Sequence, residues 1–580
     1  MTAAVVSVAP NLSKEERNGA LLLALCMFCT GGTGLVIEYV IATTTTFILG
    51  SSIVVWSLVI GIMMGAMGFS GFVQERIGDK YLLEKFFAIE VVLTLAGGYA
   101  PIGLYWAFGT FPEQFNIILY GWVILIGMLI GLEIPIVMRI LEQRGVVLRS
   151  NLKYVFGTDY LGAMVFMFVW VFWLLPNFPI AEVSFMVTSL NFIVALVAVA
   201  YFGRLGQLNA PLLVSAIAVV ALVVGVYGYH ENRNWSISME QRLYDDPIVY
   251  QETTRYQHLV ITKAKNTCEN GDEEIRLYIN GSTQFGSCDE HVYHDNLVQP
   301  VMTLTGSNQK VLILGGGDGL ALRDVLKYHP AQVILVDLDP EMVRIAKDNK
   351  YLAALNRGSF NNARVITPET KGVSQEAGVF DEVRIPNGVR NLETGTEDTE
   401  RVTDVRRIHV DAGKFLETAK DTYDVIIIDL PDPNSVELSR LYTTAFYRQV
   451  ERKLNQNGLM VVQSTSPIHA REVFLEIGRT IESVKLEAIP YHDNVPSFGE
   501  WGWWMACKGE GCETRVRATI ASLTSFGSVT DYLTLDRFRA NLSFGNVEGV
   551  PFEQSAKSTR INTMMDPTMF MRYEGAWKSY

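Results

Sequence analysis

The feature that most limits how this chain can fold is a series of apolar runs between residues 19 and 229. A helix needs about 20 apolar residues to cross a bilayer, because the bilayer core holds no water to satisfy open backbone groups. Seven runs have about that length: 19–41, 47–73, 86–108, 115–138, 154–176, 180–203 and 209–229. Buried helices of a soluble protein are the alternative, but seven runs in succession favour an all-α polytopic membrane domain. The polar tail 1–18 in front of it does not have the pattern of a cleavable signal peptide.

Acidic residues and paired glycines lie inside these runs. The acids are Glu38, Glu90, Glu133 and Asp159. An ionised carboxylate at membrane depth is costly, so each is expected to face a cavity or a partner, as part of a cation path or site. The alternative is that some lie near span ends and meet water. Two pairs of glycines are spaced so that helices can approach closely: Gly61 with Gly65, and Gly127 with Gly131.

The loops between the runs differ in charge. The loops 74–85, 139–153 and 204–208 carry eight basic residues, and the alternate loops 42–46, 109–114 and 177–179 carry none. Those basic residues are Arg76, Lys80, Lys85, Arg139, Arg144, Arg149, Lys153 and Arg204. By the positive-inside rule, the N-terminus lies in the cytoplasm, and seven spans then place the C-terminal part outside.

Residues 230–580 have the composition of a globular protein and hold most of the charge. The net charge of −13 argues against a nucleic-acid partner, which would need a basic patch, and fits a cationic substrate. Two pairs of cysteines each flank an apparent hairpin: Cys268 with Cys288, and Cys507 with Cys512. Two disulfides would suit an oxidising compartment, and buried thiols are the alternative. No cysteine and histidine spacing indicates zinc.

Two further domains are expected in this part. Short β-like runs at 248–250, 258–261 and 276–279, with a tight turn at Asn280-Gly281, predict a small β-rich domain over 240–305. The segment 306–525 then begins with a nucleotide-binding βαβ pattern. Its parts are a strand at 311–314, the turn Gly315-Gly316-Gly317-Asp318-Gly319, a helix at 320–328, a strand at 333–336 and then Asp337. This order predicts an α/β Rossmann-like domain, with Asp337 placed to accept hydrogen bonds from both ribose hydroxyls.

The acid inside the glycine turn, Asp318, indicates which nucleoside the turn suits. A carboxylate there would repel a pyrophosphate, which argues against NAD or FAD, and would attract a sulfonium ligand with a free amine. Ligands of the S-adenosylmethionine type therefore fit better. Further acids follow later strands, where open α/β sheets bind their ligands: Asp411, Asp429 and Asp432. We expect all five acids to line one cleft, and solvated loop acids are the alternative.

Six segments between about 245 and 510 together resemble spermidine synthase and the wider polyamine aminopropyltransferase family. They are R-Y-Q-H-L-V with Gln257, L-Y-I-N-G-S-T-Q-F, D-E-H-V-Y-H-D at 289–295, I-L-G-G-G-D-G at 313–319, V-D-L-D at 336–339 and D-L-P-D-P at 429–433. G-G-G-D-G followed by D-x-x-D-P separates this family from ordinary methyltransferases. The stretch V-P-S-F-G-E-W-G-W-W at 495–504 resembles the subgroup with a fused multi-spanning N-terminal region.

The resemblance implies transfer of a propylamine group from decarboxylated S-adenosylmethionine to an amine such as putrescine, giving spermidine and methylthioadenosine without a cofactor or a metal. It implies that Asp429 is the catalytic proton acceptor. It implies amine binding by Tyr293, His294, Asp318 and Asp432, and nucleoside binding by Gln257, Gly315, Gly317, Asp337, Asp411 and Ala412. We also expect a multi-pass protein of the cell (inner) membrane that forms a homodimer or higher homo-oligomer.

The chain departs from the family pattern in several places. Asp337 stands where the family often has glutamate, and Phe498 where a tyrosine is common near the acceptor pocket, so the acceptor amine stays open. A polar stretch at about 367–405 is expected to be a disordered surface insertion, with a mobile lid as the alternative. No chemistry is predicted for the C-terminal extension 526–580.

Two alternative functions remain beside the aminopropyltransferase. One is an S-adenosyl-ligand enzyme with another acceptor, and the other is a polyamine transporter or sensor whose soluble domain only binds ligand. The side of the membrane also stays open, because the loop charges place the domain outside whereas the donor nucleoside is made in the cytoplasm.

Overall fold

The computed structural model describes most of the chain and divides it into two compact units. The described residues are 14–49, 52–144, 146, 148–265, 268–269, 271–360, 364–365, 380–385, 403–547, 549–555, 560–566 and 568–577. The first unit comprises Met1–Thr262 and Ile279–Ser282, and the second comprises Lys263–Tyr278 and Thr283–Tyr580. Each unit is described below by itself.

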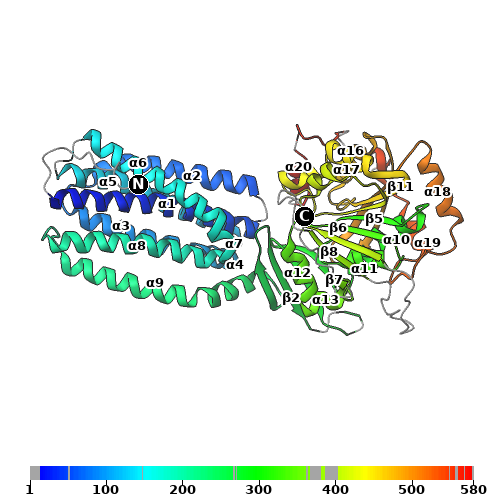
Figure 1. Cartoon of the computed structure of the whole chain (residues 1–580), viewed down its shortest axis with the longest axis horizontal. Coiled ribbons are helices and arrows are strands. Elements are labelled where there is room, and N and C mark those ends of the chain that lie inside the picture. The colour runs from blue at the N-terminus through cyan, green and yellow to red at the C-terminus, as the bar shows by residue number, and fades with distance from the viewer. Residues whose placement is uncertain are drawn as a thin grey trace. The chain divides into compact units, whose positions relative to one another are not determined.

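The first unit is mainly a set of long helices, drawn blue to green in Figure 1. They are α1 (Lys14–Leu49), α2 (Ser52–Val73), α3 (Leu82–Gly98), α4 (Ala100–Thr110), α5 (Phe115–Glu142), α6 (Leu148–Val169), α7 (Leu175–Asn177), α8 (Ile180–Arg204) and α9 (Pro211–Glu240). Within the described residues, six helices are long and apolar enough to cross a membrane, or seven if the bent pair α3 and α4 counts as one span.

The third predicted run, 86–108, is not one straight helix. The axes of α3 and α4 differ by 54° across a break at Tyr99. Two glycines, Gly97 and Gly98, end α3, and Pro101 lies in the first turn of α4, where a proline is tolerated because its missing N–H has no partner to lose. The apolar pattern alone could not show this bend, because residues on both sides of it are equally apolar.

Only one of the two glycine pairs packs against another helix. A Cβ on Gly127 of α5 would lie 2.8 Å from the carbonyl oxygen of Met63, and a Cβ on Gly131 would lie 2.5 Å from that of Met67. Helices α2 and α5 are therefore in backbone contact on this face. Gly61 and Gly65 of α2 have no atom within 4 Å of the corresponding position, so their spacing does not mark a helix contact.

Two of the predicted intramembrane acids are deeply buried. Glu90 of α3 is 0 % exposed and Glu133 of α5 is 1 % exposed. Glu90 accepts a hydrogen bond from the side-chain amide of Asn191 on α8, so it faces a partner as expected. Glu38 and Asp159 are half-buried.

A small sheet follows the helices in the chain. It contains β1 (Ile248–Thr253), β2 (His258–Ala264), β3 (Glu274–Ile279) and β4 (Ser282–Gly286), in that order. The predicted turn is confirmed, because Asn280 and Gly281 both have positive φ angles, of 49° and 79°, as a two-residue hairpin turn requires. The boundary between the two units runs through this sheet.

A nine-stranded sheet forms the centre of the second unit, with strand order β12-β13-β11-β10-β5-β6-β9-β8-β7. The strands are β5 (Lys310–Gly315), β6 (Gln332–Val336), β7 (Arg364–Val365), β8 (Phe380–Ile385), β9 (Thr403–Ile408), β10 (Tyr423–Asp429), β11 (Leu454–Gln463), β12 (Leu486–Val495) and β13 (Gly499–Lys508). The five strands from β11 to β9 are parallel, and the pairs at both edges are antiparallel. The parallel strands have the Rossmann order 3-2-1-4-5, read from β9, which confirms a Rossmann-like fold within a mixed sheet.

Helices cover this sheet, and Figure 1 shows several of them around the strands. They are α10 (Glu290–Leu304), α11 (Leu320–Leu326), α12 (Pro340–Asp348), α13 (Lys350–Leu355), α14 (Ala412–Thr418), α15 (Val436–Ser439), α16 (Thr444–Lys453), α17 (Arg471–Glu482), α18 (Cys512–Ser522), α19 (Leu535–Asn541) and α20 (Met569–Trp577). Because both faces are covered, the middle residues of the central strands β5 and β10 are apolar, and Val311, Leu312 and Ile313 are all 0 % exposed.

Both cysteine pairs are disulfides in the second unit. Cys268 is bonded to Cys288, with 5.2 Å between their Cα atoms, and Cys507 to Cys512, with 6.1 Å. Of the two possibilities that the sequence left open, disulfides or buried thiols, the structure has the disulfides.

The predicted insertion at about 367–405 lies largely outside the described residues. The expectation of a disordered insertion is wrong for Phe380–Ile385, which form β8 and pair antiparallel with β9. Backbone pairing at an open sheet edge explains this strand, since β9 would otherwise leave its edge groups unpaired.

Candidate active site

The ends of neighbouring parallel strands bring the predicted site residues of the second unit together. Strand β5 ends at Gly315 and β10 ends at Asp429, and these two residues are paired in register. The chain leaves β5 toward β6 on one side, while β10 lies on its other side. Such a reversal of strand order opens a crevice at the carboxyl ends of the strands, where α/β folds bind their ligands.

The glycine turn after β5 brings its backbone close to the acids. Gly315 has a φ of 87°, and a Cβ there would collide with the carbonyl oxygen of Asp429. The backbone N–H of Gly317 donates to Asp337 Oδ2 at 3.0 Å, and a Cβ on Gly317 would lie 2.6 Å from the same oxygen. A side chain at either position would therefore displace an acid of the site.

Asp337 directly follows β6, as the sequence predicts. Its second oxygen accepts a hydrogen bond from the backbone N–H of Asp339 at 2.9 Å. Burial and the nearby charges of Asp339 and Asp318 raise the pKa of Asp337 to about 7, although the two backbone hydrogen bonds oppose this. Each oxygen accepts one bond and so has a lone pair left for a ligand hydroxyl.

A histidine and two carboxylates form the centre of the site. One ligand atom from each of His294, Asp318 and Asp429 lies within 4.8 Å of the other two. Three such groups can hold a metal ion or an organic cation. Burial alone would lower the pKa of His294, but its hydrogen bond and ion pair with Glu290, with the charges of Asp318 and Asp429, raise it to about 9. A protonated imidazole beside two carboxylates is an arrangement that suits an organic cation.

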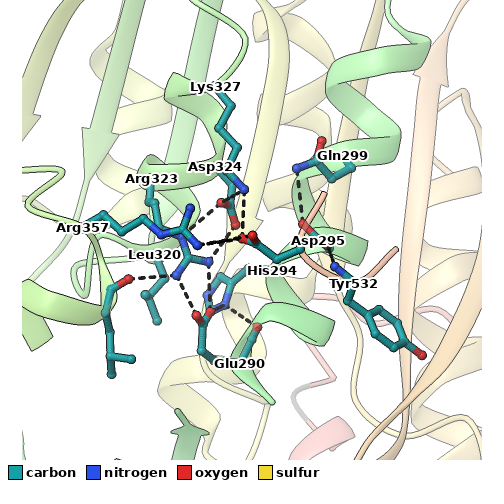
Figure 2. A network of polar contacts seen from close by, with 12 residues as sticks. Glu290, His294, Asp295, Gln299, Leu320, Arg323, Asp324, Lys327, Arg357 and Tyr532 are labelled. Carbon is teal, nitrogen blue, oxygen red and sulfur yellow. Dashed lines mark hydrogen bonds and ion pairs between the residues drawn. The ribbon is translucent and has the colours of Figure 1, made fainter. Parts of the chain in front are cut away.

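A buried network fixes this charge on His294 (Figure 2). Nδ1 of His294 lies 2.8 Å from the carbonyl oxygen of Glu290 and 2.9 Å from its carboxylate, one turn earlier on α10. Arg323 of α11 donates to both carboxylate oxygens of Glu290, at 2.6 and 3.1 Å, and to both oxygens of Asp324, at 3.0 and 3.1 Å. Arg323 is thereby paired with two buried acids.

The two acids of the D-L-P-D-P motif each accept a hydrogen bond from a tyrosine. Tyr293 of α10 donates to Asp429 Oδ1 at 2.7 Å. Tyr573 of α20 donates to Asp432 Oδ2 at 2.7 Å, and Gln463 Nε2 donates to Asp432 Oδ1 at 3.0 Å. Burial raises the pKa of Asp432 to about 6 against these bonds.

Asp318 and Asp429 both hold raised pKa values. Burial is the main cause for Asp318, and with the charge of Asp429 it outweighs the nearby imidazolium of His294, giving a pKa of about 6. Burial also raises the pKa of Asp429, although His294 and the Tyr293 hydroxyl lower it. Two carboxylates and one imidazolium leave a net negative charge, which suits a ligand with one positive group.

Three predicted nucleoside-binding residues do not belong to this group of acids and glycines. Asp411 caps α14 by accepting from the backbone N–H of Lys414, and it is ion-paired with Arg440, which lowers its pKa despite partial burial. Its carboxylate is therefore already engaged, and Ala412 follows it as the first residue of α14. Gln257 belongs to the first unit, in the turn before β2, and its role stays a prediction.

Sequence reasoning missed three contributors to the site. Glu290 could have been found, because it lies four residues before His294 and i,i+4 side chains share a helix face. Gln463 lies at the end of β11, next to the strand that carries Asp429, but an uncharged side chain gave no signal. Tyr573 lies 141 residues beyond Asp432, in the extension for which no chemistry was predicted.

Comparison with known proteins gives a consistent result. The spermine/spermidine synthase domain family matches residues 290–375 and 395–517. A polyamine aminopropyltransferase of Oceanobacillus iheyensis is 33% identical, over 94% of this chain and 96% of that protein. Polyamine aminopropyltransferase 2 of Ralstonia nicotianae is 32% identical over 91% and 93%, and polyamine aminopropyltransferase 1 of Streptomyces coelicolor is 31% identical over 98% and 97%. Matches of this length include the helical first unit as well as the second.

Proposed function

The chain belongs to the polyamine aminopropyltransferase family, and from that premise we propose that it is a membrane-bound enzyme that makes spermidine from putrescine. The donor is decarboxylated S-adenosylmethionine. An amine nitrogen of the acceptor attacks the propylamine carbon next to the sulfonium, the C–S bond breaks with its electrons on sulfur, and neutral methylthioadenosine leaves. One proton must also leave the attacking nitrogen, so the reaction needs a proton acceptor.

The observation that carries this proposal is the position of Asp429 beside Tyr293, Asp318 and His294. The acceptor amine is protonated at neutral pH, and an ammonium has no lone pair with which to attack. Asp429 lies at the strand end with a raised pKa, and burial of an ammonium would lower the pKa of the amine. Both shifts reduce the difference between the pKa of the Asp429 carboxyl group and the pKa of the ammonium group, which favours proton transfer from the amine to Asp429.

The donor nucleoside is assigned to the glycine turn and the acids on its side. We assign Asp337, which directly follows β6, to the ribose hydroxyls, and Gly315 and Gly317 to the close approach of the backbone to the nucleoside; the tight surroundings of both glycines support this assignment. Asp318 takes the amine end of the propylamine chain. We also assign Gln257, Asp411 and Ala412 to the nucleoside, on the family pattern alone.

The acceptor is assigned to the D-L-P-D-P side. Tyr293 and Asp432 contact the acceptor amine. The imidazolium of His294 balances the charge of one of the two central carboxylates, Asp318 and Asp429. The remaining negative charge suits one ammonium group at this centre, and not two. Since the sulfonium is already a good leaving group, alignment of the two substrates supplies much of the remaining acceleration.

Asp429→Asn in the full chain tests the assignment of the base. With decarboxylated S-adenosylmethionine and putrescine, we expect methylthioadenosine release to fall at least about 100-fold, because general base catalysis contributes about 10²–10⁴-fold. Binding of methylthioadenosine, followed by calorimetry, should stay within about twofold, since an amide keeps the shape of the side chain. Asp421→Asn, an exposed acid just before the same strand, is the control and should retain activity.

Two results would contradict the proposal. Unchanged turnover in Asp429→Asn would remove this residue as the base. No turnover of the wild-type chain with any amine in a panel, together with tight polyamine binding, would instead indicate a transporter or sensor, for which the buried Glu90 and Glu133 are the supporting observation.

The membrane attachment is proposed from the six or seven apolar helices of the first unit. Protein that crosses the bilayer should stay in the membrane fraction after alkaline carbonate extraction and be released only by detergent. Release by carbonate alone would show that these helices do not span the membrane.

A further inference from the structure

The C-terminal helix α20 brings a side chain to the acceptor side of the site. The Tyr573 hydroxyl donates to Asp432 Oδ2 at 2.7 Å, opposite the Gln463 amide, which donates to Oδ1 at 3.0 Å. Both carboxylate oxygens thus accept a neutral hydrogen bond, and the Thr465 hydroxyl also interacts with this carboxylate, so all of these partners are uncharged. These hydrogen bonds fix the orientation of Asp432. Because their donors are neutral, they leave its negative charge uncompensated.

The surrounding contacts hold α20 firmly in place. Arg572 forms a two-pronged ion pair with Glu476 of α17, with distances of 2.9 and 2.6 Å, and Glu476 is 3 % exposed. Met569, in the first turn of α20, is fully buried. In Figure 1, α20 lies beside α17. The position of Tyr573 is therefore set by packing.

The same C-terminal segment supports the chain that follows the D-L-P-D-P motif. Asn562 is fully buried, and its side-chain amide donates to the carbonyl oxygen of Ser439 at 2.9 Å. Its backbone carbonyl oxygen accepts from the backbone N–H of Thr444 at 2.9 Å. The extension thus contacts Asp432 directly and also fixes the end of α15 behind it.

A row of aromatic rings connects the two tyrosines of the site. Ring centroids are 6.3 Å apart between Tyr293 and Phe498, and 5.1 Å apart between Phe498 and Trp501. They are 6.5 Å apart between Trp501 and Trp577, and 6.1 Å apart between Trp577 and Tyr573. The row begins at Tyr293, which donates to Asp429, and ends at Tyr573, which donates to Asp432. Aromatic faces next to a carboxylate suit an alkyl chain that ends in an ammonium group.

We propose that α20 completes the acceptor site, with Tyr573 as a positioning residue for Asp432 and Trp577 as a specificity-determining residue for the distal end of an aliphatic diamine. This inference rests on the proposed function and adds to it the element that selects the acceptor. One ammonium of the diamine lies at Asp432 beside Trp577, and the other nitrogen reaches Asp429, where it loses its proton and attacks.

The hydroxyl of Tyr573 also affects when Asp432 is charged. Burial raises the pKa of Asp432, and the hydrogen bonds from Tyr573 and Gln463, together with the Thr465 hydroxyl, lower it again. Among the described residues, the phenols of Tyr293 and Tyr442 also interact with the charge of Asp432. Burial raises the pKa values of both phenols well above the ordinary value of 10.0, so they stay neutral over the range in which Asp432 titrates. Loss of the Tyr573 hydroxyl should therefore let Asp432 take up a proton at a higher pH.

Tyr573→Phe in the full-length, detergent-solubilised chain tests the positioning role. We expect KM for putrescine to rise about tenfold at pH 7.5, since a hydrogen bond to a charged group is lost, and to rise further as the pH falls toward about 6, where Asp432 becomes protonated. KM for decarboxylated S-adenosylmethionine, and kcat at saturating putrescine, should stay within about twofold of wild type. Because Asp429 is present in both proteins, its own titration does not alter the comparison.

Tyr447→Phe is the matched control. The Tyr447 hydroxyl is buried in the same unit and has no hydrogen-bond partner among the described residues. Removing it makes the same chemical change without removing a hydrogen bond to Asp432, and the KM for putrescine should not move at any pH.

Trp577→Phe and Trp577→Leu test the aromatic face. Phenylalanine keeps a ring and should retain acceptor KM within about threefold, whereas leucine should raise it about tenfold. An equal effect of both variants, or an effect on donor KM of the same size, would show a merely structural role.

The outcomes separate this inference from the proposed function. If the wild-type chain turns over putrescine and Tyr573→Phe leaves its KM unchanged, the inference is overturned while the function stands. If the wild-type chain binds putrescine in calorimetry without turning it over, the function fails. The inference then still holds if Tyr573→Phe weakens that binding relative to Tyr447→Phe, and fails if it does not.

Discussion

At the scale of single residues, the charge of His294 depends on its acidic neighbours, above all on Glu290. Burial disfavours the imidazolium, and Glu290, one helical turn earlier, together with the charges of Asp318 and Asp429, more than offsets that effect. Glu290 in turn has a lowered pKa, because His294 and Arg323 outweigh its own burial. His294 and Arg323 therefore carry two positive charges, and Glu290 carries one negative charge. Asp324, which is ion-paired with Arg323, supplies the second negative charge.

Glu290→Gln should destabilise the second unit in a pH-dependent way. The folded pKa of His294, about 9, is above its ordinary value of 6.5, so its pairing contributes fully below about pH 6.5 and is lost as the pH rises through 9. The lowered pKa of Glu290 contributes above its ordinary value of 4.5 and is lost at lower pH. The loss of stability should thus be largest between about pH 4.5 and 6.5, at about 3 kcal/mol, measured by urea unfolding at several pH values.

Glu341→Gln provides the comparison. Its pair with Arg344 is about half exposed, so the substitution should cost less than about 1 kcal/mol at every pH. If Glu290→Gln behaved in the same way as this surface variant, the buried network would not hold the charge of His294.

At the scale of elements, two helices of the first unit meet through glycines of one and backbone of the other. Gly127 and Gly131 lie on one face of α5, and Met63 and Met67 of α2 lie against them. Close backbone approach of this kind increases van der Waals contact, which drives helix association where both partners are apolar.

Gly131→Ala should lower the stability of the first unit, and Gly65→Ala should not. A methyl group at Gly131 would lie 2.5 Å from a backbone oxygen that cannot move aside, so the helices must separate, at a cost of about 1–3 kcal/mol. A methyl group at Gly65 meets nothing within 4 Å and gains helix propensity. Thermal unfolding in detergent micelles, followed by tryptophan fluorescence, measures the difference.

Equal effects of the two glycine substitutions would contradict this packing. The comparison is sharp because both residues lie within the same spacing pattern in the sequence, and only their surroundings differ.

At the scale of the whole molecule, two properties favour the prediction that the C-terminal unit lies on the outer side of a membrane. The basic loops 74–85, 139–153 and 204–208 predict a cytoplasmic N-terminus, and seven spans, with the bent pair α3 and α4 counted as one, would place the C-terminal unit on the other side. The two disulfides of the second unit would persist in an oxidising compartment. That orientation requires the donor nucleoside to be supplied on the outer side.

A C-terminal alkaline phosphatase fusion should therefore be active in intact cells, while a fluorescent protein that folds only in the cytoplasm should stay dark at the same position. The reverse pattern would place the catalytic unit in the cytoplasm and would mean that the bent pair α3 and α4 does not act as one span.

Thiol labelling gives an independent measurement of the same arrangement. The chain has six cysteines, and four of them are disulfide-bonded, which leaves Cys26 and Cys29. Denatured protein from intact cells should take up two alkyl groups by mass spectrometry before reduction and six after it. Six alkyl groups before reduction would show that the unit lies in a reducing compartment.

Much of this organisation follows from the sequence by itself. Apolar runs of bilayer length determine the helical first unit, because burial of so much apolar surface admits few alternatives. The βαβ pattern around Gly315–Gly319 indicates the Rossmann-like core and places Asp318 in the turn after its first strand and Asp337 directly after its second. A separate apolar run places Asp429 at the end of a later strand. Each of these features depends on neighbours close in the chain. The same local motifs were enough to indicate the family.

Other features were decided only by the tertiary structure. The bend at Tyr99, the choice between two identical glycine spacings and the engagement of Asp411 by Arg440 depend on which surfaces meet. The pairing of Tyr573 with Asp432 joins residues 141 positions apart. A single hydroxyl carries no pattern along the sequence, and only the packing of α20 against α17 determines which carboxylate it reaches. The sequence thus specified the acids of the site, and the fold decided which donors orient them.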